Sequence, residues 1–221
     1  MIAAVVTRSP GRKTSSSRSS STRQPRSRAA LDRLLALRNE HPERLAAIDR
    51  QIFEAFGATH AVLVLDMCGF SRLTVRHGIT HFLGMIHRLH GIVCPLVVGN
   101  GGRVVKTEAD NVFAVFDTAA AAVTVARAIH ENLRQANVYL PADWDLHVSL
   151  GIGFGKILLV GDHDMFGSEV NIASKLGEDI AGQSETFLTE AARAQLSADA
   201  PVQKVVIEVS SMTLTAYKLI G

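Results

Sequence analysis

The order of strand-like and helix-like segments between residues 60 and 154 most constrains the fold. Apolar, strand-like runs occur at 60–66, 102–107, 111–117 and 145–154. Helical periodicity fills the two long gaps between them, at about 72–96 and about 118–138. This β-α-β-β-α-β order is typical of the ferredoxin-like arrangement. We therefore predict an α+β fold with a ferredoxin-like βαββαβ core.

The C-terminal part of the chain extends this core with further strands and helices. The patterns predict a strand near 155–160, a helix at 168–180, a short strand at 185–189, a helix at 189–197 and a terminal hairpin at 202–220. Within this region Gly151, Gly153 and Gly155 alternate along one strand-like run. Because no G-x-G-x-x-G opens a helix there, we interpret them as a place where another backbone approaches closely, and not as a dinucleotide site.

Two strand-like runs each end at one aspartate. Asp66 closes the run at 60–66, and Asp110 lies in the turn between the runs at 102–107 and 111–117. In the predicted topology the end of the first strand lies beside that turn, so the two carboxylates become neighbours. Hard oxygen ligands suit Mg²⁺ and Mn²⁺, so this pair could hold divalent cations against a polyphosphate. The alternative is that both are turn residues at strand ends, as Asp often is.

Three motifs follow one another along the chain. A D-x-x-G-F-[ST] element spans Asp66 to Ser71, and a K-[TS]-x-x-D-x-x-x-A-x-F element spans Lys106 to Phe116. A D-x-x-G-x-x-V-N-x-A-S element starts at Asp164. Over about residues 58–200 the chain thereby resembles the catalytic domain of the class III nucleotide cyclases, the adenylate and guanylate cyclase family.

The resemblance implies the roles of several residues. Asp66 and Asp110 would bind the metals, two Mg²⁺ or Mn²⁺ ions per site, and Gly69 and Phe70 would contact the substrate. Lys106 and Asp164 would read the base. A cationic donor and a carboxylate acceptor match the ring nitrogen and amino group of adenine and mismatch guanine, so the pair favours ATP.

Two further residues would act on the ribose and the triphosphate. Asn171 would orient the ribose, and Lys175 takes the place of an Arg that binds the triphosphate in the family. Lys keeps the charge but loses the planar fork of Arg. Because they are four residues apart, both lie on one face of the predicted helix. A second departure is Ala109, where the family usually has Gly. If the turn needs a positive φ, Ala is strained there by about 1 kcal/mol.

The resemblance implies an adenylate cyclase that converts ATP to 3',5'-cyclic AMP and pyrophosphate. The ribose 3'-hydroxyl would attack the α-phosphorus, aided by two metals. Active sites in the family form between two cyclase domains, so a homodimer is expected. Two alternatives stay open: a weak or silent nucleotide-binding regulatory module, and a cyclase that uses GTP or a pyrimidine nucleotide.

Composition indicates a chain without a transmembrane segment. The longest apolar candidate, 90–102, is interrupted by Pro95 and Gly99 and falls short of the roughly 20 residues that span a bilayer. Two cysteines, Cys68 and Cys94, lie in apolar surroundings and do not make a disulfide framework. We therefore expect a reducing, cytoplasmic location.

The N-terminal part of the chain differs from the rest. Residues 1–28 contain seven basic residues and no acid, and are rich in Ser. They are interpreted as a disordered arm that could be a transit peptide, could bind an anionic partner such as nucleic acid or a membrane, or could be passive. Residues 29–57 form a helical lead-in, interrupted at His41-Pro42, that either packs on the core or pairs with its counterpart in a dimer. The cyclase-like domain is assigned to residues 58–221.

Overall fold

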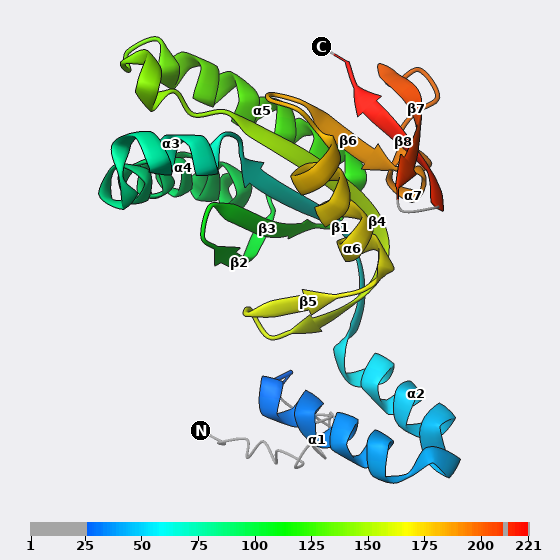
Figure 1. Cartoon of the computed structure of the whole chain (residues 1–221). Helices are drawn as coiled ribbons and strands as arrows, with labels where there is room; N and C mark the ends of the chain where they lie inside the picture. The colour runs from blue at the N-terminus through cyan, green and yellow to red at the C-terminus, as the bar shows by residue number, and fades with distance from the viewer. Residues whose placement is uncertain (1–25, 210–211, 221) are drawn as a thin grey trace, which may run out of the picture.

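The structure, a computed structural model, describes residues 26–209 and 212–220. Its centre is a mostly antiparallel sheet with the strand order β2-β3-β1-β4-β6-β8-β7, and β5 pairs with β4 off this path (Figure 1). The strands are β1 Gly57–Met67, β2 Arg103–Glu108, β3 Asn111–Phe116, β4 Val148–Val160, β5 Asp164–Phe166, β6 Thr186–Thr189, β7 Val202–Val209 and β8 Met212–Leu219. The β2-β3-β1-β4 part has the pairing of a ferredoxin-like sheet, which confirms the predicted core.

Helices cover both faces of the sheet. They are α1 Arg28–Glu40, α2 Leu45–Phe56, α3 Phe70–His77, α4 Ile79–Gly99, α5 Ala119–Asn137, α6 Ser168–Ser174 and α7 Glu190–Arg193, with a π-helix at Lys175–Ile180. Leu63 and Leu65 of β1 join the core formed with α4 and α5. Val62 and Val64 alternate with them and pack in the cluster that includes α6 on the other face. Period-two alternation of apolar residues in β1 therefore builds two cores.

Some element boundaries differ from the prediction. The single helix expected at 72–96 is divided into α3 and α4 by Gly78, whose φ is +83°. The separate strands expected at 145–154 and 155–160 form one continuous β4, and the helix expected at 189–197 is reduced to the four residues of α7. Only Gly adopts such a φ without strain, so the division at Gly78 follows from the backbone and not from the side-chain pattern.

Helix α4 corrects the expectation about apolar segments. It continues through Pro95 to Gly99, so neither residue interrupts it before its end. By length and composition α4 could cross a membrane, which the prediction denied. Core helices of soluble proteins can also be long and apolar enough to meet this criterion. Phe82, Met85 and Leu89 of α4 are buried against the sheet. Packing of this face accounts for these buried residues, while Ile79, Leu83 and Val98 of the same helix are exposed.

The three alternating glycines of β4 set the position of α6. A Cβ on Gly151 would lie 1.9 Å from the carbonyl oxygen of Ala173, and one on Gly153 would lie 2.7 Å from that of Glu169. A Cβ on Gly155 would meet the Glu169 side chain at 2.9 Å. The interpretation as points of close backbone approach is confirmed for Gly151 and Gly153, where α6 lies directly on the strand, and at Gly155 the close neighbour is a side chain.

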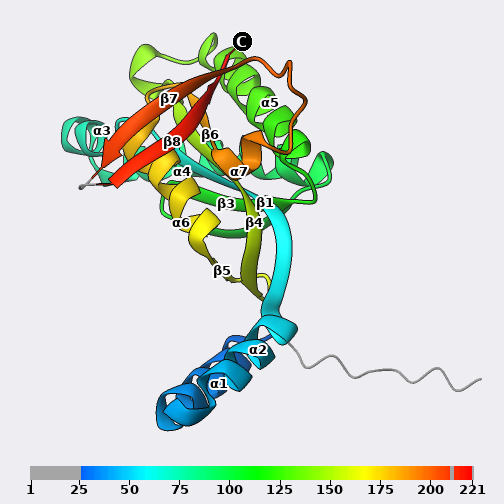
Figure 2. The same ribbon diagram turned by 90° about the vertical axis from the view of Figure 1, so that its right-hand side faces the viewer.

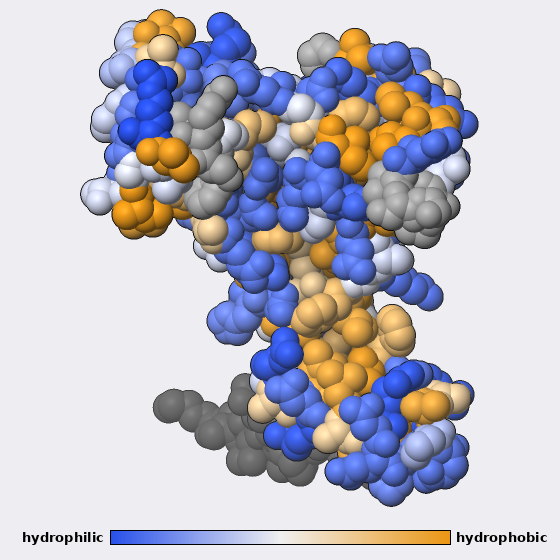
Figure 3. Space-filling model, viewed as in Figure 1, coloured by the Kyte–Doolittle hydropathy of each residue, from blue (hydrophilic) through white to orange (hydrophobic). Residues whose placement is uncertain are grey.

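The helical lead-in forms a hairpin of α1 and α2 at the far end of β1, β4 and β5 (Figures 1 and 2). The two helices are separated at His41-Pro42, as predicted, by a short 3₁₀ turn. Ile48, Ile52 and Phe56 are buried with Val160 of β4. Figure 3 shows apolar residues gathered at the narrow waist between this hairpin and the rest of the molecule. The lead-in therefore packs on the end of the domain within one chain.

Most of the basic arm, residues 1–25, lies outside the described residues. Its last residues do not continue as an arm. The Arg26 Nε donates a hydrogen bond to the carbonyl oxygen of Ala55 at 3.0 Å. Ser27 caps α1, and Arg28 is the first residue of that helix. The arm predicted over 1–28 is thus too long by these residues, because the Ser27 cap starts the helix before the apolar pattern does.

Candidate active site

The fold brings the two aspartates of the strand ends together. Asp66 is the second-last residue of β1, and β1 pairs antiparallel with β3 up to Leu65 and Val112. Asp110 lies in the turn that joins β2 to β3, directly before the first residue of β3. Both side chains are half-buried. The charges of Asp110, Glu178 and Asp179 act on Asp66, and the charge of Asp110 acts on Glu178. Their proximity was predicted from topology, and the structure has it.

Burial raises the pKa of both carboxyl groups, and repulsion by other carboxylates adds to the rise for Asp66. Burial, followed by the charges of Asp110, Glu178 and Asp179, raises the pKa of Asp66 to about 7, against a lowering by the Met67 backbone. Burial also raises the pKa of Asp110, with its own backbone and His90 acting in the opposite direction. Within the described part of the chain, neither carboxylate forms an ion pair with Lys or Arg. A bound cation would therefore stabilise the ionised form of both carboxyl groups.

Glu178 and Asp179 belong to this acidic group, since the charges of both act on Asp66. Burial and the neighbouring Asp179 raise the pKa of Glu178, and the charges of Glu108 and Asp110 add to this. Both residues lie in the π-helix Lys175–Ile180, where the wider turn changes the direction of each side chain relative to an α-helix. A π-helix has no strong sequence signal, so their place beside Asp66 could not be predicted.

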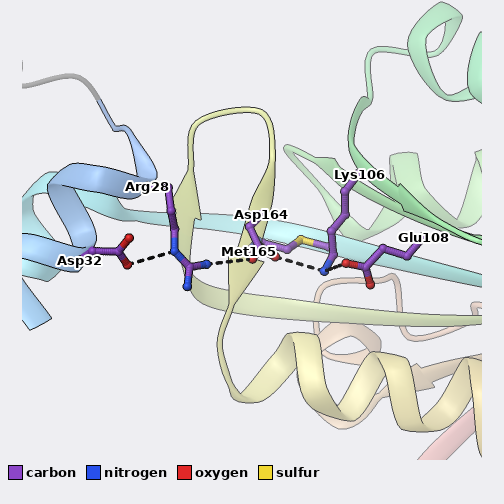
Figure 4. Close-up of polar contacts among 6 residues, drawn as sticks. All are labelled: Arg28, Asp32, Lys106, Glu108, Asp164 and Met165. Carbon is purple, nitrogen blue, oxygen red and sulfur yellow. Dashed lines mark hydrogen bonds and ion pairs between the residues drawn. The ribbon is translucent and has the colours of Figure 1, made fainter.

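Lys106 and Asp164 meet across two strands that are far apart in sequence (Figure 4). The Lys106 Nζ lies 3.1 Å from Asp164 Oδ1 and 2.9 Å from Glu108 Oε1. It also lies 4.7 Å from the centre of the Phe113 ring. Burial lowers the pKa of Lys106, but the bonds to Glu108 and Asp164 outweigh it and raise the pKa. The two residues predicted to read the base thus form one charged pair on β2 and β5.

Asn171 and Lys175 lie on α6 and at its C-terminal end. The backbone N–H of Lys175 donates to the carbonyl oxygen of Asn171, so the two residues are one helical turn apart, as expected. The Asn171 side chain is exposed. The Lys175 Nζ forms an ion pair with Asp179 at 3.0 Å. In this single chain the triphosphate-binding candidate is therefore held by a neighbouring carboxylate.

The turn before α3 and the turn before β3 both have positive φ. Gly69 has φ +89° and precedes Phe70, the first residue of α3; the Phe70 side chain lies outside the described residues. Ala109 has φ +50°. The family pattern has Gly at this second position, and the structure shows the left-handed backbone that would favour it.

The residues present fit divalent cations. Asp66 and Asp110 are two neighbouring carboxylates. Burial raises the pKa of both, and the charge of Asp110 adds to the rise for Asp66, a situation that a hard cation would relieve. No set of three or more His, Cys, Asp or Glu side chains in residues 26–209 and 212–220 is arranged to hold a metal by itself. Mg²⁺ commonly takes one or two carboxylates and completes its shell with water and phosphate oxygens, so two aspartates are sufficient.

Comparison with known proteins finds adenylate cyclases among the relatives of this chain. No family model matches the chain. It is 37% identical over 117 residues to a putative adenylate cyclase 3 of Rhizobium meliloti, covering 52% of this chain and 20% of that protein. It is 32% identical over 117 residues to an adenylate cyclase of Streptomyces coelicolor, covering 52% of this chain and 29% of that one. The chain thus spans less than a third of the length of either relative.

A solved structure shows the same fold. The adenylate/guanylate cyclase/hydrolase from Silicibacter pomeroyi superposes with a TM-score of 0.63 at 26% identity, covering 75% of this chain and 98% of that one. The motif resemblance rested on elements that contain Asp66, Asp110, Lys106 and Asp164. In the structure Lys106 and Asp164 form an ion pair at 3.1 Å. The described core of this chain therefore has the fold of a cyclase catalytic domain and is similar in sequence to adenylate cyclases over about half its length.

Proposed function

We propose that this domain is an adenylate cyclase that converts ATP to 3',5'-cyclic AMP and pyrophosphate. The observation that carries the proposal is the Lys106–Asp164 pair at 3.1 Å. Lys106 would donate to the adenine ring nitrogen and Asp164 would accept from the amino group. Guanine presents an acceptor oxygen and a donor at these positions, so both partly buried side chains would face a mismatched group. The adenylate cyclases among the relatives support this base choice.

Asp66 and Asp110 would hold Mg²⁺ or Mn²⁺, two ions per site. When bound, the ions supply activation of the ribose 3'-hydroxyl and neutralisation of charge on the attacking and leaving oxygens. The protein contributes the two carboxylates, held at the end of β1 and in the β2–β3 turn, and the acidic surroundings that strengthen their need for a cation. Gly69 and Phe70 follow Asp66 in the turn and would lie along the substrate.

The remaining groups act on the sugar and the phosphates. Asn171 is exposed on α6 and free to orient the ribose. Lys175 would leave Asp179 and bind the triphosphate, because a polyphosphate is the more strongly charged partner. Its ion pair with Asp179 is solvent-exposed and worth at most about 1 kcal/mol, so its release costs little.

We propose a homodimer with two composite sites. In the single chain, no described hydrogen bond or ion pair joins Lys106 or Asp164 to Asp66 or Asp110. In the proposed dimer each site takes Asp66 and Asp110 from one chain. The other chain supplies the base-reading residues Lys106 and Asp164, together with Asn171 and Lys175.

A cytoplasmic location and an anionic partner for the basic arm stay predictions.

A second candidate function is a nucleotide-binding module with little or no turnover. Two observations favour it: Ala109 has φ +50° beside a metal-binding candidate, and Lys175 is engaged by Asp179. This module would bind ATP without releasing pyrophosphate. A cyclase with another base preference is disfavoured by the Lys106–Asp164 pair.

Complementation of two inactive variants tests the proposed function and the composite site together. Asp110→Ala should remove metal binding and Asn171→Ala should remove ribose orientation, so each purified variant alone should make almost no cyclic AMP. Mixing equal amounts should restore about a quarter of the wild-type rate, because half of the dimers are mixed and each has one intact site. Activity in the wild type but none in the mixture would reject the shared site. A wild type that binds ATP without forming cyclic AMP would establish the binding module.

A further inference from the structure

The first residue of the helical lead-in contacts the base-reading pair. The Arg28 Nη1 lies 3.4 Å from Asp164 Oδ2, and its guanidinium carbon lies 5.8 Å from the centre of the Phe166 ring (Figure 4). The Arg28 Nε lies 3.0 Å from Asp32 Oδ1 one turn further along α1. These contacts join α1 to β5 across 136 positions of sequence. The lead-in therefore supplies a cation to a carboxylate that the motif analysis had paired with Lys106 alone.

The two oxygens of Asp164 have different partners. Oδ1 accepts a hydrogen bond from the Met165 backbone N–H at 3.0 Å and lies 3.1 Å from the Lys106 Nζ. Oδ2 faces Arg28. A carboxylate held by cations at opposite oxygens cannot rotate freely about its side-chain torsion. Arg28 and Lys106 together fix the plane in which Asp164 can accept a hydrogen bond from a base.

The position of Arg28 is itself fixed by the packing of the lead-in. Leu31, one turn further along α1, is buried in the cluster that includes Val160 of β4. Arg26, just before the helix, donates to Ala55 at the end of α2. The start of α1 is thus tied both to α2 and to the strand that leads into the β5 hairpin.

We infer that Arg28 is a positioning and specificity-determining residue, which holds Asp164 in the orientation that accepts the amino group of adenine. This inference rests on the proposed function and deepens it. The lead-in hairpin then forms part of the base pocket, although none of its residues belongs to the three motifs. Displacement of α1 would loosen Asp164, so the adenine preference of the domain depends on how the lead-in is seated.

Replacement of Arg28 by Gln should change base selection more than catalysis. Arg28 is 60% exposed and Asp164 is 23% exposed, so the pair is partly screened. An exposed ion pair of this kind supports an effect of about two- to fivefold. We expect KM for ATP to rise by about that factor, with kcat nearly unchanged. KM for GTP should change little, so the ATP-to-GTP ratio of kcat/KM falls. Arg28→Lys, which keeps the charge, should recover most of the ratio.

Matched controls separate positioning from stability. Arg33→Gln removes a charge from the same helix at an exposed position that forms no ion pair among the described residues, and should leave the ratio unchanged. Asp32→Asn removes the other partner of Arg28 and should leave the ratio close to that of the wild type. If Arg28 only fastens α1 to β5, Arg28→Gln would lower the unfolding temperature and alter both nucleotides equally.

Equilibrium binding keeps the inference separate from the proposed function. Affinities of the wild type and Arg28→Gln for ATP and GTP are measured with Mn²⁺ alongside turnover. A wild type that binds ATP but makes no cyclic AMP would reject the proposed function, while selective loss of ATP affinity in Arg28→Gln would still support the inference. An unchanged ATP-to-GTP ratio, or tighter ATP binding in Arg28→Gln, would overturn it. A wild type that binds neither nucleotide would overturn both.

Discussion

Exchange of Asp66 for Asn should stabilise the fold while abolishing turnover. Folding raises the pKa of Asp66 from 3.8 to about 7, chiefly through burial and the charge of Asp110. A difference of one in pKa between the folded and the unfolded chain corresponds to about 1.4 kcal/mol. Without solvent screening, the ionised Asp66 would therefore lower the free energy of unfolding by about 4 kcal/mol at high pH. Because Asp66 is only half-buried, solvent screening reduces this to about 1 to 2 kcal/mol. Asn keeps the shape of Asp and removes the charge, so it relieves that cost.

The effect depends on pH with a definite sign. A carboxyl group whose pKa is raised by folding binds a proton more tightly in the folded chain, so stability is lost as pH rises from about 4 to about 7. The free energy of unfolding of Asp66→Asn should therefore exceed that of the wild type by about 1 to 2 kcal/mol at pH 8. The difference should shrink steadily towards pH 4 and vanish well below the ordinary pKa of 3.8, where the wild-type carboxyl group is protonated in both states.

Urea unfolding in EDTA at several pH values measures this difference. Added Mn²⁺ should stabilise the wild type and not Asp66→Asn, because binding to the folded state alone shifts the equilibrium. Glu54→Gln, an exposed carboxylate on α2, serves as the matched control and should change neither property. If Asp66→Asn is less stable than the wild type at pH 8, or its advantage is the same at pH 5 and pH 8, the electrostatic account of this site is refuted.

Two further exchanges test the neighbouring positions. Ala109→Gly should raise the free energy of unfolding by about 0.5 to 1 kcal/mol, because a φ of +50° strains Ala and suits Gly. Thermal unfolding measures this change, and a loss of stability would show that the turn is not strained. Lys106→Gln should lower kcat/KM for ATP by about 10- to 100-fold, the loss expected when a charged hydrogen bond to the base is removed. It should lower kcat/KM for GTP far less, and an equal loss for both nucleotides in initial-rate assays would remove Lys106 from base selection.

The sequence pattern predicted the sheet core well because its periodicity is local. The β1 run alternates faces, and the helical spacing in α4 and α5 identifies the apolar faces that cover it. Backbone geometry was less predictable. Gly78 divides α3 from α4 through its positive φ, and the π-helix after Ser174 carries Glu178 and Asp179, whose charges act on Asp66. Neither feature changes the hydrophobic pattern from which helices are read.

The site residues that belong to the sequence motifs could be predicted. The residue that tertiary packing brings to the site from outside the motifs could not. Asp66, Asp110, Lys106 and Asp164 were named from motif spacing, and topology gave the proximity of the first two. Arg28 had been assigned to a disordered arm because the surrounding residues are basic and rich in Ser. Its contact with Asp164 depends on how the α1–α2 hairpin packs on β4, which no local pattern specifies.

The formation of cyclic AMP from ATP tests the central claim most directly. Purified wild type and Asp110→Ala are incubated separately with ATP, GTP, CTP and UTP in Mn²⁺, and cyclic nucleotide and pyrophosphate are quantified by mass spectrometry. The account predicts cyclic AMP and an equal amount of pyrophosphate from ATP with the wild type, and neither product with Asp110→Ala. A different cyclic nucleotide as the main product, or cyclic AMP formed equally well by Asp110→Ala, would contradict it.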